Sequence, residues 1–420
     1  MLDIKFIREN PKVVKKAAAD KQLDPALVDK VLEFDENRRY LIQKIDVIRK
    51  QANELQSSIK GKPTEEQVAK GKKFKIELAT LDPKLAETEQ QYKEVMFQIP
   101  NLPASDVPTG KDESGNKEEK KVGKIPQFSF QPKPHEKLAE NLGLYDSKRA
   151  VRIAGSRAYF LKGDLVLLEQ ALLNFALDFM VRLDFMPMSV PWMVNKDALW
   201  GTGYFPWGIE DHYTTQDGQG LIGTSEVSLT AYHQDEILDE KELPIKLVGI
   251  SPCFRREVGS YGKDTKGFIR VHQFNKIEQV VLTVADEVVT REWHEKMLGY
   301  SEQVLKTLGL SYRVLLMCTG DMGAGQRKKY DIETWFPSQN TYRETHSASY
   351  FNDFQARRLN MRYRSSDGVV KYVYTLNNTV AATPRLLAAI LENYQQEDGS
   401  VVVPEVLRKY VGKDKISSKY

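Results

Sequence analysis

Cysteine is almost missing from this chain, because Cys253 and Cys318 are the only two among its 420 residues. Two cysteines exclude a disulfide-stapled scaffold and a zinc site built from four thiolates. The six histidines show no HxxH or HExxH spacing, which argues against a metal held mainly by imidazole. We therefore expect no zinc. A chain so poor in cysteine also fits a reducing compartment, which we take to be the cytoplasm.

Long apolar runs and an excess of one charge are missing as well. No apolar stretch reaches the length of a membrane-spanning helix, about 20 residues, and the opening MLDIKFIRENPKVVKK has no signal-peptide core, so we expect no membrane association. The chain has 61 Lys and Arg against 58 Asp and Glu, so bulk charge alone cannot hold it to nucleic acid. Hydrophobic residues still make up 41%, which suits a sizeable core spread over roughly two or three domains.

The first hundred residues repeat apolar positions in alternating steps of three and four. One series spans residues 27–59 and a second spans 71–99, with a Gly-Lys-Pro breaker between them. Heptad spacing keeps apolar side chains on one seam of a helix. The pattern predicts an antiparallel helical hairpin over about 27–99 in an N-terminal domain 1–103. Pro83 predicts a kink or irregularity in the second helix.

The turn of this hairpin is its basic part. Only Glu65 and Glu66 oppose six lysines there: Lys60, Lys62, Lys70, Lys72, Lys73 and Lys75. A basic tip suits a phosphate backbone, whereas a merely solvated helix end is the alternative.

Residues 104–135 contain several prolines around the polar stretch GKDESGNKEEKK, which predicts an exposed linker. In residues 136–420, strand patterns outnumber helical patterns and mostly follow one another directly. This order predicts an α+β domain with a large antiparallel sheet flanked by helices. The helical patterns lie near 160–184, 284–308 and 384–396, and the strand patterns near 186–194, 245–256, 267–283, 311–318, 340–350, 358–364 and 369–377.

The most informative segment joins two predicted strands, SPCFRRE and FIRVHQFNKIEQVV, through a glycine-bearing loop. Successive side chains of a strand point to opposite faces. Arg255 and Glu257 therefore share a face of the first strand. One face of the second strand carries charged and aromatic side chains: Phe268, Arg270, His272, Phe274, Lys276 and Glu278.

This charged face is not a packing surface, because burying unpaired charge is costly. Guanidinium forks suit phosphate oxygens, an aromatic plane suits a base, and a carboxylate suits an amino group. The face therefore predicts a cradle for a nucleoside triphosphate and a small amine. An ion-pair ladder on an exposed sheet is the alternative.

A second anion site is predicted at the start of the C-terminal helix in TPRLLAAILENY. Thr383 is the expected N-cap and Pro384 the first helical residue. Arg385 then lies in the first turn, where the helix dipole disfavours a cation unless an anion is bound beside it. An ordinary surface arginine is the alternative.

These segments resemble the motifs of class II aminoacyl-tRNA synthetases. FRRE with the RVHQF strand resembles motif 2, ATPR resembles motif 3, and FMVRLDFMPMSVPWMV resembles motif 1. Within that class the chain is similar, over essentially its whole length, to the bacterial type of the seryl-tRNA synthetase family. The similarity includes MLDIKFIRENP, GTGYFP, GTSE, YRETHSAS, DFQARRLNMRYR and LNNTVAATPR.

The resemblance implies a coiled-coil tRNA-binding arm followed by a class II catalytic domain over 136–420. It implies activation of L-serine with ATP and Mg²⁺ to seryl-adenylate, and transfer to the 3′ end of tRNA(Ser), and of tRNA(Sec) in hosts that have it. A homodimer is also implied. Two alternatives are a class II paralogue that charges a carrier protein and a non-catalytic RNA-binding coiled-coil protein.

The resemblance also implies residue roles, with Arg255, Glu278 and Arg385 as the catalytic set. Arg255 would hold the α-phosphate, Phe274 would stack on adenine, and Glu344 and Ser347 would bind Mg²⁺ through ATP. The implied ATP-binding residues are Arg255, Arg256, Glu257, Arg270, Val271, Gln273, Phe274, Glu344, Thr345, His346, Ser347 and Arg385. The implied serine-binding residues are Thr224, Ser225, Glu226, Arg255, Glu278, Asn378 and Thr379, and the lysines of the tip would bind tRNA.

Overall fold

The computed structural model describes residues 1–258 and 267–418, and the chain falls into two compact units, Met1–Pro100 and Asn101–Tyr420. Most of the glycine-bearing loop predicted between the two charged strands falls in 259–266, outside the described residues. Across the described ranges, none of the helices combines the length and apolar character needed to cross a membrane.

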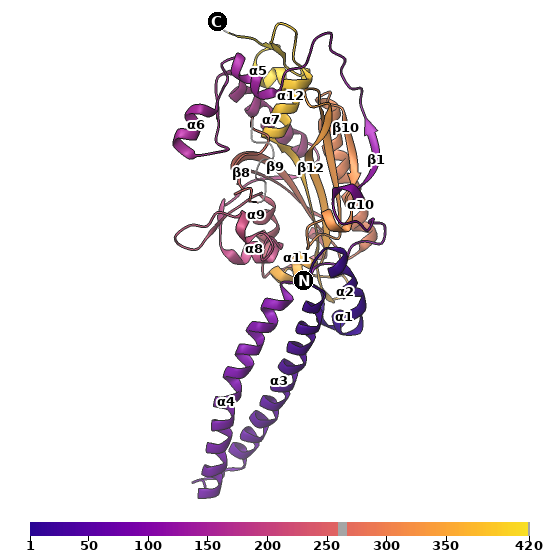
Figure 1. Cartoon of the computed structure of the whole chain (residues 1–420). Coiled ribbons are helices and arrows are strands. Elements are labelled where there is room, and N and C mark those ends of the chain that lie inside the picture. The colour runs from indigo at the N-terminus through magenta and orange to yellow at the C-terminus, as the bar shows by residue number, and fades with distance from the viewer. Residues whose placement is uncertain (259–266, 419–420) are drawn as a thin grey trace. The chain divides into compact units, whose positions relative to one another are not determined.

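The first unit is helical and contains the predicted hairpin (Figure 1). Its helices are α1 (Ile4–Glu9), α2 (Pro11–Asp20), α3 (Ala26–Ser58) and α4 (Glu65–Met96). Leu41 and Ile45 of α3 pack with Phe74 and Leu81 of α4 in one apolar cluster, as the heptad pattern predicts. Helix α4 is continuous through Pro83, so the expected irregularity does not interrupt it.

Polar contacts stabilise the start of α4 and the base of this hairpin. A reciprocal capping box starts α4, because Thr64 accepts from the Gln67 backbone N–H at 3.2 Å and donates its own to the Gln67 side chain at 2.9 Å. At the base, the buried Asp35 carboxylate pairs with Arg8 of α1 at 3.3 Å and with Arg39 at 3.1 Å. A buried carboxylate needs such partners, and the pair with Arg8 ties α1 to α3.

The second unit is built on an eight-stranded sheet. Its strands, in spatial order, are β1 (Lys117–Val122), β10 (Tyr312–Leu316), β11 (Lys328–Phe336), β12 (Thr341–Asn352), β15 (Tyr374–Ala382), β9 (Gln273–Thr283), β8 (Ile245–Phe254) and β4 (Met186–Ser189). All neighbours are antiparallel except the parallel pair β4–β8. The prediction of an α+β unit with a large antiparallel sheet is confirmed.

The main helices cover both faces of this sheet (Figure 1). They are α7 (Asp164–Val181), α8 (Lys196–Thr202), α9 (Glu226–Thr230), α10 (Glu287–Thr307), α11 (Phe354–Leu359) and α12 (Thr383–Asn393). Shorter elements complete the unit: α5 (His135–Asn141), α6 (Ser147–Ala154), α13 (Glu405–Val411), β2 (Tyr145–Asp146), β3 (Phe160–Leu161), β5 (Met193–Val194), β6 (Gly220–Leu221), β7 (Ile237–Asp239), β13 (Arg362–Arg364), β14 (Val370–Tyr372), β16 (Val401–Val402) and β17 (Lys415–Ile416).

Strand β9 shows how alternate residues separate the two faces. Ile277 and Val281 are buried in the larger core, to which α7, α10 and α12 contribute. Val280 faces the other way, into a second core with α8, α9 and α11. Glu278 lies two residues before Val280 and therefore on the same side. The charged side chains of β9, Lys276 and Glu278, thus face the side of the sheet that carries the second core.

Three predictions about this unit need correction. Part of the expected exposed linker 104–135 is strand β1, which pairs with β10 at the edge of the sheet. Its side chains are charged and exposed, as on many edge strands, so its composition resembles that of a linker. Strand β11 was missed, and the strand predicted over 267–283 begins only at Gln273.

We predict that the seam of α3 and α4 holds the hairpin together. Replacing Ile45, which is 1% exposed, with alanine should destabilise the hairpin by about 2–5 kcal/mol through lost burial and a cavity. Amide hydrogen exchange of the arm in the full-length chain measures the loss of stability. We expect faster exchange in both α3 and α4 of the variant. The control is Val47→Ala on the same helix, because Val47 is 50% exposed and should change the exchange little. Equal effects of the two substitutions would contradict the seam.

Candidate active site

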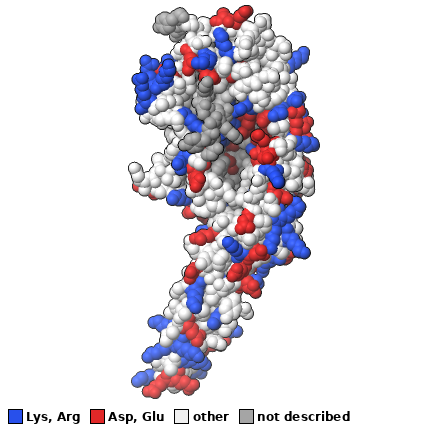
Figure 2. Space-filling model, in the orientation of Figure 1, with Lys and Arg blue, Asp and Glu red and all other residues white. Residues whose placement is uncertain are grey.

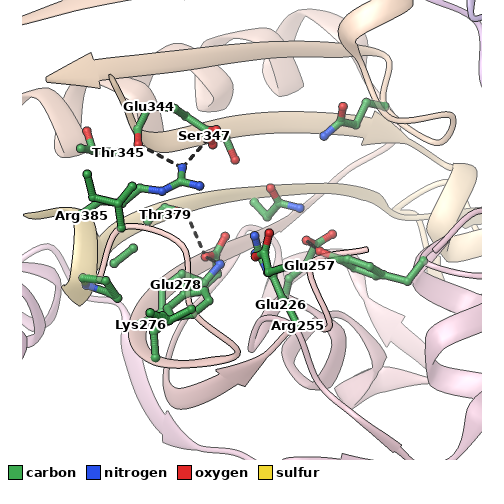
Figure 3. Close-up of a pocket in the computed structure, with 18 residues that line it drawn as sticks. Glu226, Arg255, Glu257, Lys276, Glu278, Glu344, Thr345, Ser347, Thr379 and Arg385 are labelled. Atoms are coloured by element: carbon green, nitrogen blue, oxygen red, sulfur yellow. Dashed lines mark hydrogen bonds and ion pairs between the residues drawn. The ribbon is translucent and has the colours of Figure 1, made fainter. Parts of the chain in front are cut away.

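A pocket opens on the face of the sheet to which Glu278 points (Figure 3). Side chains from β9, β12, β15, the segment after β8 and the first turn of α12 form most of its wall. The lining residues are Tyr204, Glu226, Arg255, Glu257, Ile269, Val271, Phe274, Lys276, Glu278, Gln326, Glu344, Thr345, Ser347, Asn377, Thr379, Ala382, Pro384 and Arg385.

One end of the pocket centres on Glu278, which is 2% exposed. Its carboxylate forms an ion pair with Lys276 of the same strand and accepts a hydrogen bond from Thr379 Oγ1 at 3.3 Å. Lys276 Nζ also donates to Thr224 Oγ1 at 2.7 Å. The register of β9 and β15 places Thr379 directly opposite Glu278. This end therefore offers a buried carboxylate, an ammonium group and hydroxyls within one small volume.

A second buried carboxylate, Glu226, lies at the first turn of α9. Tyr204 Oη donates to Glu226 Oε2 at 2.7 Å, and Gln355 Nε2 donates to Oε1 at 3.0 Å. Burial raises the pKa of Glu226, while these two donors work in the opposite direction. The donors thus favour a charged carboxylate at a depth that would otherwise disfavour it.

Arg255 follows β8 and extends along the ring of Phe274. Its guanidinium carbon lies 5.3 Å from the ring centroid, and its Nε donates to the Gly223 carbonyl at 3.2 Å. These contacts leave the terminal guanidinium nitrogens as donors toward the pocket that Arg255 lines (Figure 3). A planar guanidinium fork is suited to phosphate or carboxylate oxygens.

The other end of the pocket joins Glu344 of β12 to Arg385 of α12. The two side chains pair at 3.1 Å, and Arg385 Nη1 also donates to the Glu344 carbonyl at 3.0 Å (Figure 3). Burial alone would raise the pKa of Glu344, but the charges of Arg385 and Lys329 outweigh it and lower that pKa to about 2. Glu344 is therefore an ionised carboxylate at neutral pH.

A β-bulge determines which face of the sheet the side chains of this part of β12 point to. Ile332 pairs with His346 and Glu333 pairs with Glu344, so Thr345 is an extra residue on β12. In a regular strand, residues 344 and 347 would face opposite sides of the sheet. With the bulge, Glu344 and Ser347 both line the pocket. Their oxygens are of the kind that suits a hard divalent cation such as Mg²⁺.

The structure brings most of the predicted site residues to one pocket. From the predicted sets, the lining includes Glu226, Arg255, Glu257, Val271, Phe274, Glu278, Glu344, Thr345, Ser347, Thr379 and Arg385. Arg270 lies beside it, pairs with Glu257 at 2.7 Å and lines an adjoining cavity that Glu344 and Arg385 also border. Thr224 lies behind the lining and contacts it through Lys276.

Residues before Gln273 do not follow the predicted alternation, because that stretch is not a strand. Phe268 is fully buried against His135 and Tyr145, with ring centroids 4.8 Å and 5.5 Å away, and does not face the pocket. His272 also turns away, since its Nδ1 lies 3.0 Å from the Arg255 carbonyl. The predicted cradle therefore begins at Phe274.

Two predicted ATP-binding side chains also lie outside the pocket. Gln273 is exposed on a neighbouring groove shared with Tyr213. The Arg256 guanidinium donates to the Glu210 carbonyl at 3.0 Å. Arg255 and Arg256 are adjacent in an extended segment, so their side chains diverge.

Three further predicted residues point away from the pocket. His346 Nε2 lies 3.1 Å from the Val380 carbonyl, and burial lowers the pKa of His346 to about 4, so it is neutral. Asn378 donates to the Met297 carbonyl of α10 at 2.7 Å, on the opposite side of the sheet from Thr379. Ser225 is buried beneath β8. None of these three side chains lines the pocket in which the prediction placed them.

Four polar lining residues had no predicted binding role. Lys276 was placed on the charged face but given none, and Tyr204 lies in the GTGYFP segment without distinct chemistry of its own. Asn377 lines the pocket instead of Asn378, and alternation from Thr379 would have identified it. No sequence pattern indicates Gln326.

Comparisons with known proteins cover both units. Residues 1–103 match the seryl-tRNA synthetase N-terminal domain, and residues 211–394 match the tRNA synthetase class II core domain for G, H, P, S and T. The serine–tRNA ligases of Deinococcus radiodurans and Brucella melitensis are 43% and 44% identical over 98% of each chain.

Solved structures agree with these sequence relatives. A seryl-tRNA synthetase from Pyrococcus horikoshii complexed with ATP matches with a TM-score of 0.93 and 40% identity, covering 100% of both chains. A cytoplasmic serine–tRNA ligase from Naegleria fowleri in complex with AMP matches with a TM-score of 0.88 and 35% identity, covering 100% of this chain and 99% of that chain.

We predict that Lys276 is required to keep Glu278 buried. Lys276→Met should lower the free energy of unfolding by about 3–5 kcal/mol, because it leaves a buried carboxylate without its cation. Thermal and urea unfolding of the full chain measure the loss. In the double variant with Glu278→Gln, most of the stability should return. A double variant no more stable than Lys276→Met would contradict the pairing.

Proposed function

The chain belongs to the seryl-tRNA synthetase family and acts as a serine–tRNA ligase, and we propose that it activates serine with ATP in the pocket of Figure 3. The observation that carries this proposal is the division of one pocket into a carboxylate end, with Glu226 and Glu278, and a guanidinium end, with Arg385. Arg255 lines the same pocket, and its guanidinium group can pair with the phosphates of ATP and with the carboxylate of serine.

At the nucleotide end, Phe274 stacks on adenine and Glu257 accepts from the adenine amino group. Val271 and Thr345 add walls to this part of the pocket. Arg255 holds the α-phosphate and Arg385 the γ-phosphate end. The contact of Arg255 with the Phe274 ring supports a base and a phosphate lying side by side there. Arg270 reaches the γ-phosphate end from the adjoining cavity.

At the amino-acid end, Glu226 and Glu278 bind the ammonium and hydroxyl groups of serine. Thr379 donates to Glu278, and Thr224 acts through Lys276. A site built around a substrate hydroxyl rejects the analogue that lacks it, because buried polar groups would then be left unpaired. Alanine should therefore be a poor substrate.

The reaction needs no covalent nucleophile from the protein. A serine carboxylate oxygen forms a bond to the α-phosphorus while the bond to the β-phosphate oxygen breaks, giving seryl-adenylate and pyrophosphate. The terminal ribose hydroxyl of tRNA then attacks the seryl carbonyl carbon, and AMP leaves. Arg255 and Arg385 contribute by orienting the phosphates and neutralising the charge that develops on them.

Glu344 and Ser347 would hold Mg²⁺ brought by ATP. Their oxygens share one face through the bulge at Thr345, and the low pKa of Glu344 keeps its carboxylate ionised. When bound, the ion supplies charge neutralisation on the β- and γ-phosphates. Zinc has no part in this proposal.

The N-terminal domain 1–103 would bind tRNA(Ser), and tRNA(Sec) where the host has it. All six lysines of the tip are exposed, and Figure 2 shows Lys and Arg gathered over the distal part of the arm. Contacts to phosphates and sugars suit such a surface, which lacks a platform of stacked aromatic rings. The presence of the arm argues against a paralogue that charges a carrier protein. The charged pocket of the second unit argues against a non-catalytic RNA-binding protein.

We also propose that the chain acts as a homodimer in the cytoplasm. The segment that resembles motif 1 exposes four large apolar side chains: Val181, Met186, Trp192 and Met193, at 44%, 58%, 49% and 55%. Apolar exposure of this kind is typical of a surface that another chain covers.

We predict that Arg255→Ala lowers the rate of serine-dependent ATP–pyrophosphate exchange by about 10²–10³-fold, because the developing phosphate charge loses its donor. Arg256→Ala is the matched control, since the neighbouring guanidinium donates to the Glu210 carbonyl outside the pocket. Comparable losses in the two variants would contradict the assignment. Exchange by the wild type that is equally fast with alanine would contradict the serine site.

We predict that the lysine tip serves tRNA and not the activation step. Replacing Lys70, Lys72, Lys73 and Lys75 with alanine should reduce kcat/KM for tRNA in aminoacylation and flatten its dependence on salt, since fewer phosphate contacts release fewer counterions. Pyrophosphate exchange should stay unchanged. Lys84→Ala, on the same helix away from the turn, is the positional control. Unchanged charging by the quadruple variant would contradict this role.

A further inference from the structure

Helix α11 (Phe354–Leu359) contributes none of the described residues that line the pocket. It nevertheless contacts α9 and β15, two elements that form the amino-acid end, through hydrogen bonds of Gln355. Gln355 reaches Glu226 directly. Gln355 Nε2 also donates to the Thr202 carbonyl at 2.9 Å, and Arg358 Nη1 donates to the Trp200 carbonyl at 3.0 Å. The last carbonyls of a helix have no partner within it. Side chains of α11 therefore cap the C-terminal end of α8.

The approach of α11 to α8 depends on two glycines of the GTGYFP segment. A Cβ on Gly201 would lie 2.2 Å from Leu359 Cδ2, so any larger residue there would force the buried Leu359 side chain to move. Gly203 ends α8 with φ of +85°, a left-handed conformation that glycine adopts without strain. The chain then turns directly into Tyr204, whose hydroxyl contacts Glu226.

The amide of Gln355 has only one favourable orientation. Its Nε2 uses both hydrogens, one on the Thr202 carbonyl and one on the Glu226 carboxylate, and its Oε1 accepts from Thr375 Oγ1 at 2.5 Å. If the amide were rotated by half a turn, its oxygen would face two acceptors. Gln355 is 1% exposed, so water cannot relieve such a mismatch.

Both oxygens of Glu226 are consequently held by side chains of the protein. Tyr204 donates to one and Gln355 to the other, and Glu226 as a whole is 6% exposed. Two donors in fixed positions set the plane of the carboxylate and favour its ionised form.

We propose that Gln355, oriented by Thr375, is a positioning residue that holds Glu226 ionised and aimed at the ammonium group of serine. Gln355 and Thr375 do not contact the substrate. They act through Glu226, so serine affinity depends on α11 and on the start of β15 as well as on the pocket wall. This inference rests on the proposed role of Glu226 in binding serine.

The test compares Gln355→Met and Thr375→Val with wild type in serine-dependent pyrophosphate exchange. Loss of a hydrogen bond to a charged group should raise the KM for serine about tenfold to hundredfold in Gln355→Met. Thr375→Val should raise it less, because the Glu226 contact is weakened and not removed. The KM for ATP should stay near its wild-type value, and kcat should change less than the KM for serine.

The pH profile supplies a readout that loss of packing alone would not move. Gln355 lowers the pKa of Glu226, so Gln355→Met should shift the acidic limb of kcat/KM for serine to higher pH. Tyr204, Lys276 and Glu278 also face Glu226 and are unchanged in the variant. The shift therefore reports the missing donor.

Two controls separate positioning from stability. Thr375→Ser keeps the hydroxyl and should restore the KM for serine. Gln395→Leu removes another buried glutamine, 2% exposed, whose amide donates to the Lys133 carbonyl at 3.0 Å far along the chain from Glu226. It should change thermal stability but not the KM for serine.

The outcomes also distinguish this inference from the proposed function. If Glu226→Gln leaves serine-dependent exchange intact, the role of Glu226 fails. If Glu226→Gln abolishes exchange but folded Gln355→Met keeps the wild-type KM and pH profile, the positioning role alone is overturned. Equal rises of the KM for serine and the KM for ATP would likewise overturn it, because they would indicate a general loss of structure.

Discussion

The catalytic unit depends on keeping two carboxylates charged inside the protein. Glu226 and Glu278 are 6% and 2% exposed, and a charge at that depth persists only where cations or hydrogen-bond donors compensate its lost hydration. Lys276 and Thr379 do this for Glu278. The donors come from different elements of the fold, so the charge requirement joins strands and helices that are far apart in the sequence.

Irregular strands place the chemistry as much as regular ones do. The bulge at Thr345 puts Glu344 and Ser347 on one face, and a second bulge between Thr379 and Ala381 disturbs the register of β15 beside Glu278. A bulge rotates the following side chains onto the other face. Glu344 and Ser347 therefore share the pocket face because β12 departs from strict alternation, whereas Lys276 and Glu278 share it through the regular alternation of β9.

Predictions from the sequence succeeded where one local period controlled the outcome. The heptad spacing identified α3 and α4, and period-two alternation placed Phe274, Lys276 and Glu278 on one face. They failed where the period stopped. Phe268 was assigned to the same face, but its stretch is not a strand, and its ring packs into the core. Asn378 was assigned to serine from the family resemblance, but it is next to Thr379 in a strand and therefore faces the opposite side of the sheet.

The sequence by itself determined the helical hairpin, the antiparallel character of the second unit and the residue types that serve a nucleotide and a small amine. Tertiary structure alone decided that KKYDIETWF forms strand β11, that the charged stretch Lys117–Val122 is an edge strand, and that Gln355 reaches Glu226. Periodicity is a property of neighbouring residues, so a sequence displays it directly. Pairing between distant segments is settled by which buried groups must find partners, and that becomes visible only when the chain is folded.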